Sequence, residues 1–128
     1  MNVLIVESEP ELSLLWTWHL ERLNAHVAQA DGQESAIALL QQENFDVIIM
    51  DLVLAQGSSL AVADFASYRR PDAKVIFVTN TSFFSDGSIF LHCNNACAYV
   101  QSHTRPEDLV AMVEHYGTPT PKPTTAGL

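Results

Sequence analysis

Short apolar runs alternate with longer segments of helical periodicity along most of the chain. Runs rich in β-branched residues predict buried strands at Asn2–Val6, His26–Ala30, Asp46–Met50, Lys74–Thr79 and Ala96–Val100. Apolar positions three and four residues apart predict helices at Pro10–Leu23, Gln33–Gln42, Ser58–Arg70, Ser85–Asn94 and Thr104–Gly117. This alternation predicts an α/β fold: a doubly wound, five-stranded parallel sheet with five helices.

The first predicted helix carries two apolar strips. We expect its core-facing strip to consist of Leu12, Trp16, His19 and Leu23. Trp18 lies two residues after Trp16, about 200° around the helix, and forms a second strip with Leu14. That second strip is either the margin of a wide buried face or a docking surface, because an exposed tryptophan commonly anchors a protein interface.

The composition limits the class of protein. The 128 residues include 15 acidic and 6 basic ones, a net charge of −9, which argues against a surface for nucleic acid. No apolar run reaches the roughly 20 residues that cross a bilayer, and the first residues lack the features of a signal peptide. Two cysteines exclude a disulfide scaffold, so we expect a cytoplasmic protein. We expect one domain over residues 1–116 and a flexible Pro/Thr-rich tail or linker over 117–128.

Polar side chains stand where three predicted strands end. Glu7 follows the first strand, Asp51 follows the third, and Thr79 closes the fourth. Parallel sheets place their functional sites at the carboxyl ends of the strands, so these three side chains form a candidate site. Two neighbouring carboxylates repel each other unless a proton, a hydrogen bond or a cation compensates. Carboxylates, carbonyls and water are the ligands of Mg²⁺, and the sequence therefore predicts a cation site here.

Enzymatic alternatives find little support in the motifs. A nucleotide or flavin binder of this architecture needs a loop after the first strand that cradles phosphate, but that loop reads ESEPE and repels it. No G-x-G-x-x-G or Walker pattern occurs in the chain, and no Ser-His-acid or Cys-His arrangement falls at the strand ends. We therefore expect a protein that is not an enzyme.

Several segments resemble the receiver domains of response regulators over roughly residues 2–116. IVESEPEL is similar to their acidic opening, DVIIMDLVL to their phosphoacceptor strand, and VIFVT and CAYVQS to their fourth and fifth strands. The resemblance implies a flavodoxin-like, receiver-type fold. It also implies that Asp51 is the phosphoacceptor, that Glu7, Asp51 and the carbonyl of Val53 are metal ligands, and that Thr79 and Tyr99 form the switch.

Several positions depart from the family pattern, and two of them bear on the metal and on the phosphoryl group. Ser8 stands where the second metal-binding acid is expected, and Ser102 stands at the position of the lysine that follows the fifth strand. Ser8-Glu9-Pro10-Glu11 is also a helix-capping box, so we interpret Ser8 as a cap rather than a ligand. With one carboxylate fewer, Mg²⁺ is expected to bind weakly or not at all.

Two functions remain open on this basis. The chain is either a phosphoryl-accepting switch of a two-component or phosphorelay pathway, or a pseudo-receiver that acts as a phosphorylation-independent interaction module. The partner implied is a histidine kinase or a phosphotransfer protein, docking on Leu14 and Trp18, and a homodimer is also left open. No nucleic acid and no membrane is expected to bind this domain.

Overall fold

A five-stranded parallel sheet forms the centre of the computed structural model, which describes residues 1–79 and 95–117. Its strands are β1 (Asn2–Val6), β2 (His26–Ala30), β3 (Val47–Asp51), β4 (Lys74–Thr79) and β5 (Ala96–Gln101), in the order β2-β1-β3-β4-β5. The helices among these residues are α1 (Pro10–Glu21), α2 (Gln33–Gln42), α3 (Ser59–Arg69) and α4 (Pro106–Gly117). The predicted doubly wound sheet is confirmed. The predicted helix Ser85–Asn94 and residues 118–128 of the predicted tail lie outside the described residues.

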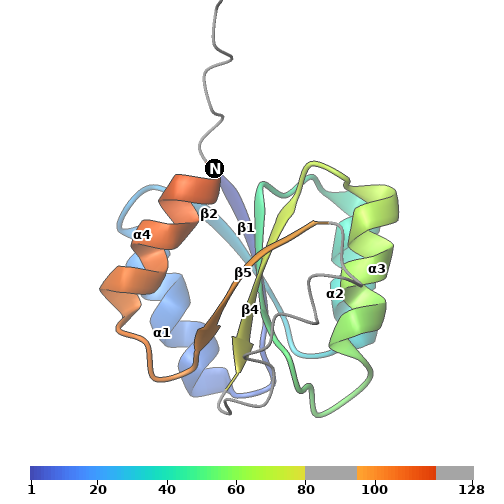
Figure 1. Ribbon diagram of the computed structural model, residues 1–128, viewed down its shortest axis with the longest axis horizontal. Helices are drawn as coiled ribbons and strands as arrows, with labels where there is room; N and C mark the ends of the chain where they lie inside the picture. The colour runs from blue at the N-terminus through green and yellow to red at the C-terminus, as the bar shows by residue number, and fades with distance from the viewer. Residues whose placement is uncertain (80–94, 118–128) are drawn as a thin grey trace, which may run out of the picture.

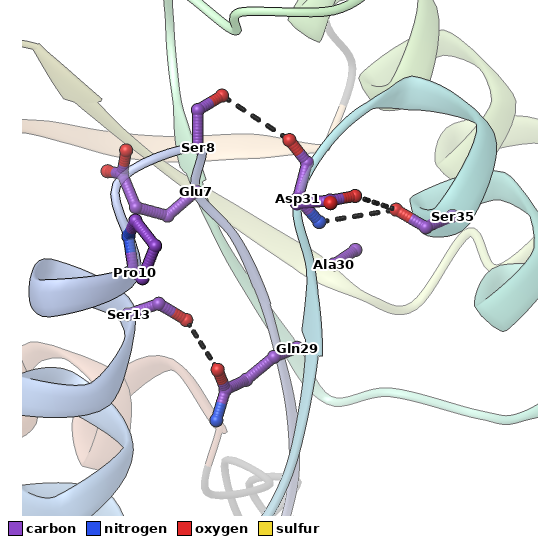
Figure 2. A pocket seen from close by; sticks show the side chains of 8 residues that line it. All are labelled: Glu7, Ser8, Pro10, Ser13, Gln29, Ala30, Asp31 and Ser35. Atoms are coloured by element: carbon purple, nitrogen blue, oxygen red, sulfur yellow. Dashed lines mark hydrogen bonds between the residues drawn. The ribbon is translucent and has the colours of Figure 1, made fainter.

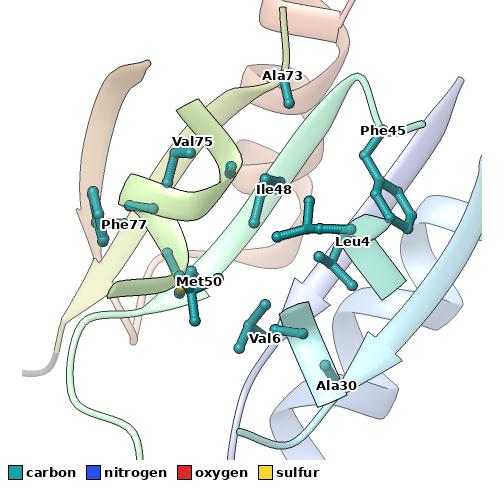
Figure 3. Close-up of a cluster of buried hydrophobic side chains, with 14 of the residues drawn as sticks. Leu4, Val6, Ala30, Phe45, Ile48, Met50, Ala73, Val75 and Phe77 are labelled. Atoms are coloured by element: carbon teal, nitrogen blue, oxygen red, sulfur yellow. The ribbon is translucent and has the colours of Figure 1, made fainter. Parts of the chain in front are cut away.

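The helices cover both faces of the sheet, and each face has its own buried cluster. Figure 1 shows α1 and α4 on one side and α2 and α3 on the other. Leu4, Ile48 and Phe77 belong to the cluster under α2 and α3 (Figure 3), whereas Ile49 and Ile76 belong to the cluster under α1 and α4. Successive residues of a strand point to opposite faces, which explains why near-continuous apolar strands serve both clusters.

The buried face of α1 differs from the predicted one. The buried residues are Ser13, Trp16, Thr17 and Leu20, whereas Leu23 is 46% exposed and lies beyond the end of the helix. Two hydroxyls can be buried here because both are hydrogen-bonded: Ser13 Oγ donates to Gln29 Oε1 at 2.9 Å, and Thr17 Oγ1 donates to the carbonyl of Ser13 at 2.7 Å. A hydrophobic pattern cannot predict such a face, since it treats both hydroxyls as polar.

The last helix follows its prediction closely. Leu109 and Val113 are buried in the cluster under α1 and α4, and Met112 and Tyr116 pack against it. The helix ends against the beginning of the chain: a Cβ atom on Gly117 would lie 2.4 Å from Met1 Sδ and 3.1 Å from Val47 Cγ2. Over the described ranges, no helix combines the length and apolarity needed to cross a membrane.

Candidate functional site

Two carboxylates meet at the carboxyl edge of the central strands. Val6 of β1 is paired with Met50 of β3, so the next residues, Glu7 and Asp51, are neighbours. Glu7 is only 3% exposed, and its Oε2 accepts a hydrogen bond from the N–H of Glu9 at 3.1 Å. Its Oε1 is buried and has no hydrogen-bond partner among the described residues. The expected pair of carboxylates is therefore present, with one oxygen unsatisfied.

The environment of Glu7 favours its protonated form. Burial, and next the side chain of Asp51, raise the pKa of Glu7 to about 7, although the N–H of Glu9 acts in the opposite direction. A buried oxygen without a partner is costly unless a proton or a cation occupies its vicinity. These oxygen ligands therefore suit a divalent cation, but they are few. Within residues 1–79 and 95–117, no group of three or more His, Cys, Asp or Glu side chains is placed to hold a metal ion.

The loop that follows Asp51 bends back over it. The N–H of Val53 donates to Asp51 Oδ1 at 3.0 Å, and the side chain of Val53 is 69% exposed. Asp51 itself is half-buried and belongs to β3, one residue later than the predicted end of the strand, because it pairs with Val78 of β4. The backbone N–H of Val53 consequently lies beside the carboxylate of Asp51.

Ser8 does not cap α1, and this prediction was wrong. The helix begins after Glu9, which makes no capping hydrogen bond through its side chain. Ser8 Oγ instead donates to the carbonyl of Asp31 at 3.3 Å, a contact drawn in Figure 2, and accepts the N–H of Ala55 at 2.8 Å. The hydroxyl therefore connects two loops that lie far apart in the sequence.

Thr79 and Tyr99 lie on the neighbouring strands. Thr79 closes β4 and is buried, one residue beyond the partner of Asp51 in the register. Tyr99 is half-buried on β5, opposite Phe77 of β4. The sheet thus brings Thr79 to the same edge as the carboxylates, whereas Tyr99 lies two pairs back along the β4–β5 ladder.

The family comparison agrees with this geometry. The family model of the response regulator receiver domain matches residues 3–114. The chain belongs to this family. Receiver domains are signalling domains of two-component systems, and nothing in this match indicates catalysis of a separate reaction.

Individual relatives are distant. The response regulator receiver protein CpdR of Brucella abortus is 29% identical over 78 residues, which are 61% of this chain and 65% of CpdR. A receiver domain protein of Methanospirillum hungatei superposes with a TM-score of 0.83 at 22% identity, over 91% of this chain and 92% of that one. A response regulator protein of Burkholderia pseudomallei, solved with a phosphorylated aspartic acid, calcium ion and citrate, has a TM-score of 0.78 at 24% identity, over 86% and 64% of the two chains. Both structural likenesses show the fold.

Ser102, which the resemblance aligns with the lysine of the family pattern, lies in a backbone turn. Ser102 is half-buried, and its N–H donates to the carbonyl of Thr79 at 2.8 Å. Arg105 is the first basic residue after β5, and its guanidinium pairs with Asp108 at 3.1 Å. Among residues 95–117, the first arginine after β5 is therefore paired with a carboxylate on its own helix rather than placed at the site.

The second apolar strip of α1 lies outside the core. Leu14 is 60% exposed and Trp18 is 55% exposed, one helical turn apart. The guanidinium of Arg22 stacks over the ring of Trp18 at 4.8 Å from the centroid, so the outer face of this strip combines apolar surface with a positive charge.

Sequence reasoning missed one residue of this region, Gln33. Its Oε1 accepts the N–H of Ser58 at 2.8 Å, and its own N–H donates to the carbonyl of Gln56 at 3.2 Å. The residue fastens the start of α2 to the loop that follows β3. The only indication in the sequence is the glycine at position 57, which permits the close approach.

Proposed function

We propose that this receiver domain accepts a phosphoryl group on Asp51 and passes the change on through Thr79 and Tyr99. The observation that carries the proposal is the buried Glu7 carboxylate beside Asp51, with an oxygen that has no partner in the described part of the chain. Such a group lowers the stability of the fold on its own. A buried carboxylate beside a half-buried aspartate is expected if this edge of the sheet has to bind a cation next to a transferred phosphoryl group.

The transfer uses the chain's own groups in a simple way. A carboxylate oxygen of Asp51 attacks the phosphorus of a partner's phosphohistidine, an O–P bond forms, and the P–N bond breaks with its electron pair remaining on the imidazole. The protein's part is positioning and stabilisation of charge on the phosphoryl oxygens. Thr79 offers a hydroxyl from β4, and Ser102 adds no positive charge. We therefore expect the transfer to be slow.

A divalent cation suits the same edge. Glu7, Asp51 and the carbonyl of Val53 would hold Mg²⁺, and the phosphorylated relative of Burkholderia pseudomallei carries a calcium ion. When bound, the ion supplies positive charge against the phosphoryl oxygens. With Ser8 in place of a carboxylate, we expect weaker binding than a site with three acids would give.

Thr79 and Tyr99 are suited to report the modification. The carbonyl of Thr79 accepts the N–H of Ser102, so a shift at the end of β4 is passed to the end of β5. We expect the partner that delivers the phosphoryl group, a histidine kinase or a phosphotransfer protein, to dock on Leu14 and Trp18.

A second candidate is a pseudo-receiver that binds a partner without phosphorylation. It is favoured by Ser8, whose hydroxyl already donates one hydrogen bond and accepts another within the fold. Neither of its interactions requires an ion. On this reading Asp51 is a structural residue and the surface of α1 alone carries the function.

Intact mass measurement separates the two candidates. The domain is incubated with Mg²⁺ and acetyl phosphate, alongside Asp51→Asn and the control Asp64→Asn, which changes an exposed aspartate of α3. We expect a slow gain of one phosphate in the wild type and in the control, and none in Asp51→Asn. No gain in any of the three, together with partner binding that Asp51→Asn leaves unchanged, would support the pseudo-receiver.

A further inference from the structure

Three hydrogen bonds fasten the loop between β3 and α3 to Ser8 and Gln33. The N–H of Ala55 donates to Ser8 Oγ at 2.8 Å, and the N–H of Ser58 donates to Gln33 Oε1 at 2.8 Å. The carbonyl of Gln56 accepts the N–H of Gln33 at 3.2 Å. Ser8 and Gln33, the two residues whose side chains take part in these three hydrogen bonds, come from another loop and from the start of α2.

The backbone is shaped for this contact. Gly57 has a φ of +88°, and a Cβ atom there would lie 2.3 Å from the Cβ of Gln33. A side chain at Gly32 would also be tight, because its Cβ would lie 3.2 Å from the carbonyl oxygen of Gln56. Glycine on both sides permits the loop and the start of α2 to approach closely. The fastening is thus built into the backbone as well as into the side chains.

The same loop carries the groups that surround the phosphoacceptor. Its residue Val53 donates a hydrogen bond to Asp51 Oδ1 at 3.0 Å and is two residues from Ala55. The preceding residue, Leu52, is fixed to β4 because its N–H donates to the carbonyl of Val78 at 2.7 Å. Val53 is therefore held between one anchor on the sheet and another on Ser8.

We propose that Ser8 and Gln33 are positioning residues that hold the backbone of Val53 against Asp51 without the help of a bound metal ion. Ser8 stands where the family pattern expects an acid, and its hydroxyl does what a carboxylate cannot do, since it donates one hydrogen bond to Asp31 while it accepts another from Ala55. The loss of a metal ligand is thereby linked to the gain of a fixed loop. The consequence for reactivity rests on the proposed phosphorylation of Asp51.

Amide exchange measured residue by residue tests whether the loop is held in this way. In the wild type, the amides of Ala55 and Ser58 should be equally protected in EDTA and in Mg²⁺. In Ser8→Ala the amide of Ala55 should exchange about tenfold faster than in the wild type. In Gln33→Ala the amide of Ser58 should exchange faster by the same factor. The loss of one net hydrogen bond changes the equilibrium for local opening by roughly that much. Ser8→Thr retains a hydroxyl and should restore protection.

Matched controls exclude general loosening. Ser67→Ala and Gln42→Ala remove the same side-chain types from α3 and α2, away from the loop, and should leave both amides as in the wild type. Protection in the wild type that appears only with Mg²⁺ would overturn the proposal. So would variants that exchange like the wild type. If Ser8→Ala does not fold, Gln33→Ala decides the question alone.

The labelling rate with acetyl phosphate tests the consequence for Asp51. Ser8→Ala and Gln33→Ala should label more slowly than the wild type, with Ser8→Thr and both controls unchanged. Altered exchange with an unchanged labelling rate would refute the positioning role. A wild type that does not label at all refutes the proposed phosphorylation, and the exchange experiment still decides whether Ser8 and Gln33 hold the loop.

Discussion

The carboxyl edge of the sheet and the outer face of α1 depart from the usual distribution of polar and apolar groups in opposite directions. At the edge, the carboxylate of Glu7 is 3% exposed, whereas on α1 the indole of Trp18 is 55% exposed. Charged groups are rarely buried without a partner, and large aromatic groups are more often buried than not. Neither residue stabilises the isolated domain where it lies, so each indicates an interaction that the domain alone does not provide.

The two departures differ in what would correct them. A proton or a cation would relieve Glu7, so its cost should depend on pH and on added ions. Apolar surface would have to cover Trp18 and Leu14, so their cost should be insensitive to pH. The difference separates a site that works by charge from one that works by contact area, and it can be measured as free energies of unfolding.

A core residue of α4 gives the scale for that comparison. Leu109 of α4 is only 2% exposed and belongs to the buried cluster between the sheet and helices α1 and α4. Leu109→Ala should therefore lower the free energy of unfolding by about 2–5 kcal/mol. Leu60→Ala, which shortens a leucine that is 44% exposed on α3, should cost less than about 1 kcal/mol. Denaturant melts measure both. A loss under about half a kcal/mol for Leu109→Ala would show that α4 does not pack on the sheet through this face.

Glu7→Gln should sharpen the contrast at the edge. The variant keeps the shape but not the charge, so at about pH 8 it should be more stable than the wild type by about 1–3 kcal/mol, the cost of an unsatisfied buried group. Added Mg²⁺ should raise the melting temperature of the wild type and leave the variant nearly unchanged. Melts with and without Mg²⁺ give both results. Greater stability of the wild type at that pH would mean that its charge is already compensated within the fold.

The difference in stability between the wild type and Glu7→Gln should depend on pH in a definite direction. The folded-state pKa of Glu7 lies at about 7, above its ordinary value of 4.5, so the folded chain binds this proton more tightly than the unfolded chain. The resulting stability is fully present below about pH 4.5 and is lost as the pH rises to about 7. The advantage of Glu7→Gln over the wild type should therefore grow between these values. A constant difference across this range would contradict a raised pKa.

Trp18→Ala should have the smallest effect on stability. The indole is mostly exposed, and its stacking with Arg22 is worth at most about 1 kcal/mol at such a site, so melts should change by less than that. Binding to the partner kinase or phosphotransfer protein, measured by titration calorimetry, should be weakened at least tenfold, as is typical of an interface anchor. Tyr68→Ala removes another exposed aromatic residue, on α3, and should leave binding intact. A large loss of stability in Trp18→Ala would instead make this residue part of the core.

The sheet could be predicted because each strand is specified by a short run of neighbouring residues in the sequence. Short apolar runs predict all five strands to within one residue of the observed bounds. The meeting of Glu7 and Asp51 follows from the rule for parallel strands, and it needs no knowledge of side-chain packing. Asn24 has a left-handed conformation, with a φ of +64° just after α1, as is common for an asparagine at a helix end.

Sequence-based prediction failed where a side chain forms its hydrogen bonds with residues distant in the sequence instead of nearby ones. A capping box at Ser8 is a local pattern, but the observed partners of its hydroxyl lie 23 and 47 residues away in the sequence. Part of the buried face of α1 was missed for a similar reason: Trp16 is buried as predicted, but Ser13 is buried through a hydrogen bond to Gln29 of β2. Gln33 itself gave no signal, because a glutamine at the start of a helix is ordinarily a solvated residue, and only the glycine at position 57 indicated the close approach.

The contact of Gly117 with Met1 has a practical consequence for engineering this domain. Because α4 runs back along the sheet, its end at Gly117 lies beside Met1, at the end of the strands opposite Glu7 and Asp51 (Figure 1). Neighbouring ends of this kind favour circular permutation. A permutant that joins residue 117 to Met1 through a short flexible linker, and opens the chain at an exposed turn such as Asn24, should preserve the sheet order. Such a permutant would carry a fluorescent reporter at the opened turn and leave the edge with Glu7 and Asp51 unobstructed.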